Sequence, residues 1–265
     1  MSSKKQKPFD KYAYYIRAVQ SPEMDCEFIR DTFKEIRKKP ARTIREDFCG
    51  TFAICCEWAT RHRDNQSVGV DLDIEPLTYG REKYWAKLKP AQQARVKTVQ
   101  GSVLTANVPK VDVIVALNFS YYLFKSKLLL RQYFMRARRG LKKDGLFIVD
   151  CFGGGDCQSA NEECTKISNF EYFWDQTNFN PITNEALFHI HFKRKGERKR
   201  EKVFSYDWRI WTIPEIREAM MDAGFRRTHV YWEGTTRSGY GDGKFTRTEK
   251  GEECDGWVAY IVAEV

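Results

Sequence analysis

The chain has 265 residues, of which 45 are lysine or arginine and 36 are aspartate or glutamate, so its formal net charge is +9. This length accommodates one large α/β domain with an insertion, or two small domains. The sequence has no apolar run of roughly eighteen residues and no secretory leader, and we therefore expect a soluble cytoplasmic protein. The eight cysteines include no Cys-x-x-Cys pair, and we expect them to be free thiols that bind no metal.

Most of the positive charge lies in two segments. The segment 193–202 contains seven basic and two acidic residues, and Lys4, Lys5 and Lys7 lie in a polar N-terminal tail. Two interpretations stay open for the segment 193–202. It is either a solvated hairpin tip whose charges oppose edge-to-edge strand pairing, or a surface that binds an acidic or nucleic-acid partner.

Two helices are expected before the first strand. The segment 9–20 has an aromatic, helical pattern. Ser21 and Pro22 then provide an N-cap and a first-turn proline for a second helix that ends near residue 38.

The stretch 44–53 combines a short strand, a turn at Gly50 and an apolar helix that begins near Phe52. Such a turn presents free backbone N–H groups at a helix N-terminus, where a nucleotide-like ligand binds. The next strand, 67–71, ends in Asp71, whose carboxylate can accept both hydroxyls of a ribose. The spacing of these features predicts a nucleoside site.

The glycine pattern indicates which nucleoside fits. A pyrophosphate requires three glycines, whereas Phe48 and Phe52 occupy the positions that flank Gly50. A ligand without phosphates, held by its ribose and by an ammonium-carboxylate tail, requires less room. S-adenosylmethionine has this form.

Helices and strands alternate along the first 150 residues. The expected elements after Asp71 are a helix over 76–88, strands over 96–100 and 111–117, a helix over 127–141, a turn over 142–145 and a strand over 146–151. This alternation predicts an α/β, Rossmann-like fold with a mostly parallel sheet and helices on both faces. Ligands bind such sheets beyond the carboxyl ends of the strands.

The segment 156–211 interrupts this alternation. Its aromatic, alternating runs predict an inserted antiparallel sheet, two strands of which meet across Gly196. A helix over 214–223 and an antiparallel closing pair of strands, over 228–232 and 257–265, complete the chain. We expect the polar segment 234–256 between them to be a long loop.

Over most of its length the sequence resembles the class I S-adenosylmethionine-dependent methyltransferases. The stretch from Glu46 to Gly50 resembles their first motif, Asp71 stands at their ribose-binding position, and Ser102 lies in a stretch that resembles the adenine-contacting motif. The strand over 111–117, followed by Asn118 and Tyr121, resembles the motif beside the methyl group. The resemblance implies a set of cofactor-binding residues: Glu46, Phe48, Cys49, Gly50, Asp71, Leu72, Gly101, Ser102, Val103 and Asn118.

The inserted sheet is the predicted place of substrate recognition, because the strand ends are assigned to the cofactor. Its placement resembles the small antiparallel sheet of N-methyltransferases of the glycine N-methyltransferase type. We expect a tail and helical lid over 1–40, a cofactor domain over 41–155 and 212–265, and a substrate subdomain over 156–211. The candidate acceptor-binding residues are Tyr15, Trp174, Asp175, Tyr206, Trp208 and Arg209.

Four residues are candidates for contact with the reacting atoms. Asn118 and Tyr121 follow the fourth strand. His189 and His191 lie two apart and share one face of a strand, so either is a proton acceptor if that face lines the pocket. Plainer interpretations stay open: Asn118 caps a turn, the histidines are a buried structural pair, and the tryptophans and Tyr15 pack in a core.

The resemblance and the predicted site together indicate an enzyme that transfers a methyl group from S-adenosylmethionine to nitrogen or oxygen of a small molecule. One alternative is the same transfer to RNA or a protein held by the segment 193–202. The other is a binding module without catalysis, because Phe48 and Phe52 can narrow the cofactor cleft.

Overall fold

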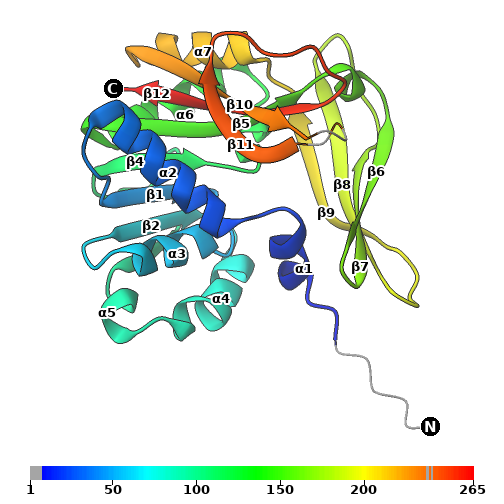
Figure 1. Cartoon of the computed structure of the whole chain (residues 1–265), viewed down its shortest axis with the longest axis horizontal. Helices are drawn as coiled ribbons and strands as arrows, with labels where there is room; N and C mark the ends of the chain where they lie inside the picture. Colours follow the sequence, from blue (N-terminus) through cyan, green and yellow to red (C-terminus); the bar gives the residue numbers. More distant parts are fainter. Residues whose placement is uncertain (1–7, 237–238, 240) are drawn as a thin grey trace.

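Two β-sheets organise the computed structural model, which describes residues 8–236, 239 and 241–265 (Figure 1). The large sheet has eight strands in the order β11-β10-β12-β5-β4-β1-β2-β3, and the small sheet has four in the order β6-β7-β8-β9. Lys4, Lys5 and Lys7 of the predicted tail lie outside the described residues.

The centre of the large sheet is parallel, as predicted. Its parallel strands are β1 (Thr43–Asp47), β2 (Gln66–Asp71), β3 (Val96–Gln100), β4 (Val111–Ala116) and β5 (Leu141–Gly153). The run from Val113 to Ala116 is fully buried because helices cover both faces of the sheet. The predicted turn over 142–145 is wrong, since these residues are part of β5, where the pairing with β4 shifts register.

Helices cover both faces of this sheet. α2 (Pro22–Arg37) and α3 (Ala53–Arg61) pack on one face, and α6 (Lys127–Arg139) and α7 (Ile213–Asp222) pack on the other. α4 (Ile74–Lys83), η1 (Trp85–Lys87) and α5 (Pro90–Gln93) complete the layer beside α3. This arrangement confirms the Rossmann-like α/β prediction. Within the described ranges, no helix combines the length and apolarity needed to cross a lipid bilayer.

Three antiparallel strands close the sheet beyond β5. β12 (Trp257–Glu264) lies between β5 and β10 (Arg227–Thr235), which confirms the predicted closing pair. The prediction of a long loop over 234–256 is wrong, because β11 (Gly241–Thr248) forms the sheet edge within it. Most β11 residues are exposed or half-buried, so this edge strand carries little apolar alternation for a sequence pattern to reveal.

The segment after β5 forms the predicted antiparallel sheet. Its strands are β6 (Asn161–Ile167), β7 (Phe170–Gln176), β8 (Glu185–Arg194) and β9 (Arg200–Arg209), each antiparallel to the next. The turn between β8 and β9 contains Gly196 at φ 80°, a conformation that favours glycine.

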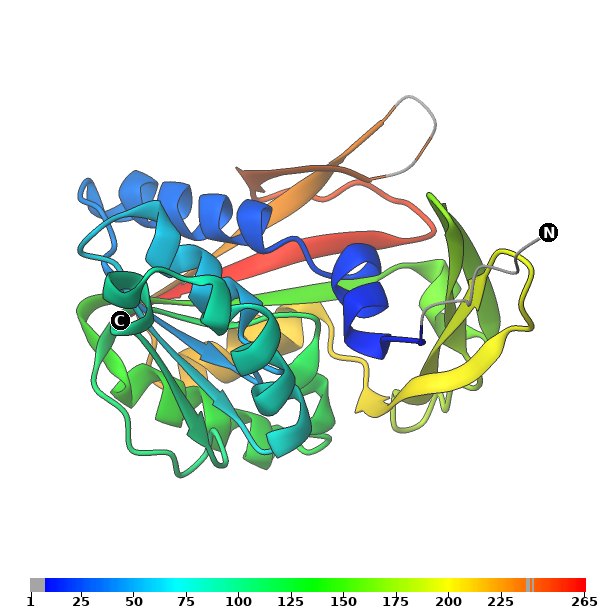
Figure 2. The ribbon, with the colours of Figure 1, turned by 90° about the horizontal axis from the view of Figure 1, so that it is seen from below.

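The first helix, α1 (Lys11–Ala18), lies between the two sheets (Figure 2). On the side of the large sheet, Tyr79 of α4 donates a hydrogen bond to Asp10 at 2.9 Å, and Lys11 pairs with Glu75 at 2.7 Å. On the other side, the ring of Tyr15 lies 5.0 Å from that of Phe204 of β9. α1 therefore bridges α4 of the large-sheet layer and the small sheet.

Candidate active site

The turn after β1 has an unusual backbone. Phe48, Gly50 and Phe52 all adopt left-handed conformations, with φ of 56°, 50° and 45°. A Cβ atom built on Gly50 would meet no atom within 4 Å, so the space in front of this turn is open. The turn leads directly into α3 (Ala53–Arg61), so it lies at the N-terminus of a helix.

The two phenylalanines of this turn pack away from the opening. Phe52 is only 1% exposed. Its ring packs against Gly80 of α4, because a Cβ atom built on Gly80 would lie 2.7 Å from Cε1 of the ring. The ring of Phe48 contacts Tyr133 and Phe124, with centroids 5.5 and 6.0 Å apart. The space in front of Gly50 thus stays open although two glycines of the dinucleotide pattern are missing.

Asp71, the last residue of β2, stabilises this turn through a hydrogen bond to its carboxylate. Its Oδ2 accepts a hydrogen bond from the N–H of Gly50 at 2.7 Å, and its Oδ1 accepts one from the N–H of Asp73 at 2.9 Å. Burial raises the pKa of the Asp71 carboxyl, while these N–H donors lower it. The Asp71 carbonyl also accepts from the N–H of Gly101 at 2.8 Å. Gly50, Asp71 and Gly101 therefore meet at one edge of the sheet.

The other predicted cofactor residues divide into two groups. Leu72 follows Asp71 and is 69% exposed, which leaves an apolar side chain at the sheet edge. The side chains of Glu46, Cys49 and Val103 are buried instead and support the turns from inside. Glu46 accepts a hydrogen bond from the N–H of Cys55 at 3.1 Å, and burial raises its pKa to about 8.

Ser102 also has a local role. Its hydroxyl oxygen accepts a hydrogen bond from the N–H of Leu104 at 3.2 Å, which stabilises the turn that follows β3. The hydroxyl therefore stabilises the backbone next to Gly101.

The close packing of α4 under the turn gives a first prediction. A Cβ atom on Gly80 would lie 2.1 Å from the carbonyl oxygen of Thr51. We expect Gly80→Ala to lower the free energy of unfolding by about 3 kcal/mol, although alanine favours helix over glycine. It should also weaken binding of S-adenosylhomocysteine, measured by calorimetry.

Gly101→Ala is the matched control for Gly80→Ala. The nearest atom to its Cβ would be 3.9 Å away, an ordinary contact, so the stability should change by less than about 0.5 kcal/mol. Equal effects of the two substitutions would contradict the packing argument.

The loop after β4 is held by a carboxylate that the sequence patterns did not single out. Asp150 of β5 accepts hydrogen bonds from the N–H groups of Asn118 and Phe119, at 2.6 and 2.9 Å. Both of these residues have φ of 57°, so the carboxylate fixes a left-handed pair. Burial raises the pKa of Asp150 to about 7. The position of Asp150 beside the neighbouring strand end was the only signal that could have identified it.

The structure does not place Tyr121 at the reacting atoms. Tyr121 lies in η2 (Ser120–Leu123), is completely buried, and donates its hydroxyl hydrogen to the carbonyl of Asp150 at 2.7 Å. The tight turn rotates its ring into the core. Of the two predicted residues after β4, only Asn118 faces a cavity.

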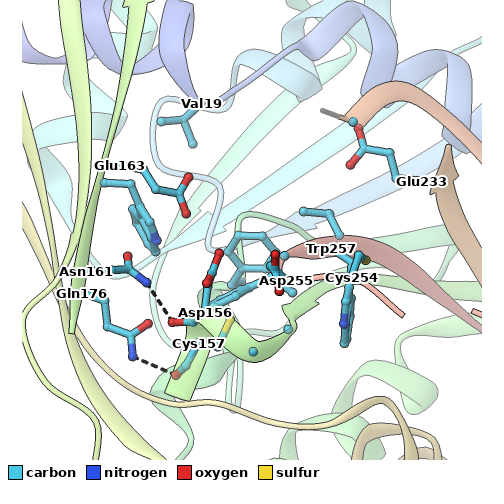
Figure 3. Close-up of a pocket in the computed structure, with 18 of the residues that line it drawn as sticks. Val19, Asp156, Cys157, Asn161, Glu163, Gln176, Glu233, Cys254, Asp255 and Trp257 are labelled. Atoms are coloured by element: carbon cyan, nitrogen blue, oxygen red, sulfur yellow. Dashed lines mark hydrogen bonds between the residues drawn. The ribbon is translucent and has the colours of Figure 1, made fainter. Parts of the chain in front are cut away.

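That cavity lies between the small sheet, the ends of β4 and β5, and the closing strands. Its volume is about 1240 Å³. Four predicted acceptor-binding residues line it together with Asn118: Tyr15, Trp174, Tyr206 and Trp208. Figure 3 shows it bordered by side chains from β6, β7, η3 (Gly155–Gln158) and the segment before β12. It lies at the same sheet edge as the turn at Gly50, because β4 pairs directly with β1 in parallel.

His189 and His191 lie on the opposite face of the small sheet, and the condition for their predicted role as bases therefore fails. Ile190 between them faces the cavity, and neighbouring residues of a strand point to opposite faces. His189 contacts the hydroxyl of Ser205 at 2.8 Å, and His191 contacts the carboxylate of Asp175 at 3.1 Å. Asp175 is thus also placed away from the acceptor cavity.

Arg209 does not line the cavity either. Its guanidinium pairs with Glu215 at 3.0 Å and lies 3.8 Å from the centroid of the Trp211 ring. It also donates to the carbonyl of Lys125 at 3.1 Å. The arginine therefore joins β9 to α7.

The positive charge of the segment 193–202 is partly neutralised by carboxylates of the protein. Four of its seven basic residues form ion pairs with carboxylates: Lys193, Arg194, Lys199 and Arg200. Such pairs reduce the charge that the hairpin offers to a polyanion.

Comparisons with known proteins place this geometry in a fold family. No protein-family model matches the chain, and no curated protein matches it significantly in sequence. The chain is similar in structure to an S-adenosylmethionine-dependent methyltransferase from Clostridium acetobutylicum, with 17% identity, a TM-score of 0.70, and coverage of 96% of this chain and 98% of that one. The chain has the class I methyltransferase fold.

Two further solved structures show the same methyltransferase fold. The CcbJ methyltransferase from Streptomyces caelestis has 16% identity and a TM-score of 0.67 over 97% of this chain and 99% of that one. An amino pentose methyltransferase from Micromonospora echinaspora, involved in calicheamicin biosynthesis and solved with S-adenosylmethionine bound, has 14% identity and a TM-score of 0.66 over 99% of both chains. The similarity thus includes the inserted sheet as well as the parallel core.

Proposed function

We propose that this protein transfers the methyl group of S-adenosylmethionine to nitrogen or oxygen of a small molecule bound between the two sheets. The observation that carries the proposal is the turn at Gly50, which has open space in front of it and whose N–H donates a hydrogen bond to Asp71 at 2.7 Å. This turn and the cavity that Asn118 lines lie at the same edge of the sheet. A methyl donor and its acceptor require this adjacency.

The residues around this turn fit an adenosyl ligand. The Asp71 carboxylate lies at the end of β2, the position from which a carboxylate accepts ribose hydroxyls. The turn at Gly50 also leads into the N-terminus of α3, and a helix N-terminus favours a carboxylate such as that of a methionine tail. Leu72 offers an exposed apolar side chain to a purine face. The ligand itself supplies a methyl group on a positively charged sulfur.

The protein itself contributes by aligning the methyl donor with the acceptor and by excluding water from them. A rigid arrangement of two reactants can contribute about 7–11 kcal/mol to lowering the barrier. Asn118 is held beside the cavity by the Asp150 carboxylate, and Tyr15 of α1 covers the same space. In this proposal α1 is a lid that closes over both ligands, and no general base among the histidines is required.

A small acceptor fits better than RNA or a protein. The cavity of about 1240 Å³ exceeds many ligand pockets, but it lies between the two sheets with Tyr15 of α1 in its lining, and the basic hairpin is partly ion-paired. Two structural neighbours are named as an amino pentose methyltransferase and a sugar N-methyltransferase, which supports an acceptor of this size.

Replacement of Asp71 tests the cofactor site. We expect wild-type protein to bind S-adenosylmethionine and S-adenosylhomocysteine in calorimetric titrations, and Asp71→Ala to weaken both at least about a hundredfold, because two hydrogen bonds to a charged acceptor are lost. Asp73→Ala is the matched control. The Asp73 carboxylate accepts from the N–H of Glu75 and caps α4, so its loss should affect stability more than ligand affinity.

Two results of these titrations would contradict the proposal. If neither ligand binds the wild type, the proposed transfer is wrong and a cofactor-free binding module is favoured. If Asp71→Ala and Asp73→Ala weaken binding equally, Asp71 has no specific role in ribose recognition.

A further inference from the structure

Among the described residues that line the cavity, every charged residue is acidic. Five acidic residues line it: Asp156, Glu163, Glu233, Glu253 and Asp255. Among the lining residues that the structure describes there is no lysine, arginine or histidine. Since basic residues outnumber acidic ones in the whole chain, this distribution opposes the overall charge of the protein.

These carboxylates have no cationic partner within the described part of the chain. Every ion pair among the described residues involves other acidic groups. Glu233 is half-buried and accepts one hydrogen bond, from the N–H of Gly243 at 3.0 Å. In Figure 3 the carboxyl groups of Glu163 and Glu233 point from opposite sides toward the space between them. Unpaired carboxylates around a shared cavity attract a positive charge.

Aromatic rings form the wall opposite the closing strands. Trp208 lies between Tyr206 and Trp174, with centroids 4.5 and 6.1 Å away, and the Trp174 ring is 6.4 Å from that of Phe152. All four residues line the cavity. The face of an aromatic ring carries partial negative charge and attracts an ammonium group, so this wall and the carboxylates favour the same ligand.

We propose that the methyl acceptor is an organic cation, a basic amine with an apolar or aromatic body, and that phosphate- or carboxylate-bearing molecules are disfavoured. The statement that the bound cation is the methyl acceptor rests on the proposed function. The preference of the cavity for a positively charged ligand does not depend on that function. Before the transfer, the bound ammonium group loses one proton to water at the open mouth, which leaves a lone pair on nitrogen. This lone pair then forms a bond to the methyl carbon, and the carbon–sulfur bond breaks with its electrons remaining on sulfur.

A matched series of probes tests the charge preference. Phenethylamine, phenethyl alcohol and phenylacetate share one ring and differ in charge, and the cavity tryptophans provide a fluorescence signal. With S-adenosylhomocysteine present, we expect the amine to bind at least about tenfold more tightly than the alcohol and the carboxylate. Its affinity should decrease as salt is added.

Two variants test whether the carboxylates of the cavity cause the preference for the amine. The double substitution Glu163→Gln with Glu233→Gln should weaken amine binding at least about tenfold and leave alcohol binding unchanged, because glutamine keeps the shape and the acceptor for Gly243. Glu201→Gln, an exposed position of β9 outside the cavity, should change neither.

The results distinguish the two proposals. Equal affinity for all three probes, tighter binding of phenylacetate, no amine binding, or an unaffected double variant would each overturn the cation preference. Failure of S-adenosylhomocysteine to bind in the calorimetric titration would instead overturn the proposed transfer. The probe series without that ligand would still report the charge preference.

Discussion

Replacement of Asp47 with alanine is expected to lower the free energy of unfolding by about 3–5 kcal/mol. Asp47 ends β1 and accepts two hydrogen bonds from the guanidinium of Arg45, at 2.6 and 2.7 Å, and a third from Tyr133 at 2.9 Å. Arg45 and Asp47 are both about 1% exposed. The substitution leaves a buried guanidinium without its anion, next to the turn at Gly50. Denaturant unfolding measures the loss.

A variant without any of the three polar groups is the control for Asp47→Ala. The triple substitution Arg45→Met, Asp47→Leu and Tyr133→Phe fills the site with apolar atoms and leaves no buried charge. Its stability should lie within about 2 kcal/mol of the wild type. If the single variant loses less than about 1 kcal/mol, or if the triple variant is as unstable as the single one, the argument from an unpaired buried charge is wrong.

Replacement of Asp150 with alanine should release the loop beside the acceptor cavity. The carboxylate accepts two backbone N–H groups, and each buried donor that loses its acceptor costs about 1–3 kcal/mol. Asn118 and Phe119 also lose the contact that holds both at φ 57°. We expect a stability loss of about 2–5 kcal/mol and faster hydrogen exchange across residues 116–124, measured by mass spectrometry.

Two further variants separate this effect from a general loss of charge. Asp150→Asn keeps one acceptor oxygen and should give an intermediate result. Asp156→Asn removes an exposed carboxylate at the cavity rim and should leave exchange in the loop unchanged. Wild-type stability and exchange in Asp150→Ala would show that the loop holds its conformation without the carboxylate.

The parallel core was predictable because its signals are local. Buried parallel strands are short apolar runs, and the helices between them repeat their apolar residues with a period that the sequence displays, as in the run from Val111 to Ala116. The turn at Gly50 and the carboxylate of Asp71 were predictable for the same reason, since both follow a strand directly. The inserted sheet was recognisable from its alternating aromatic residues.

Other features depended on contacts between distant segments. The alternation along β8 showed that His189 and His191 share a face, but only the packing of the sheet decided that this face points away from the cavity. Tyr121 follows β4 like Asn118, and a single tight turn placed its ring in the core. β11 had no readable pattern because an exposed edge strand buries few side chains.

The sequence by itself determined the order of strands and helices in the parallel core and the Rossmann-like α/β class, and it predicted a nucleoside site at Gly50 and Asp71. These follow from backbone preferences and from the periodic burial of apolar residues, which act over a few residues. The tertiary structure alone decided that Asp150 of β5 holds the loop after β4, and that acidic side chains from β6, η3, β10 and the segment before β12 surround one cavity. Their proximity results from sheet topology, because strands that are neighbours in space are separated by long stretches of chain.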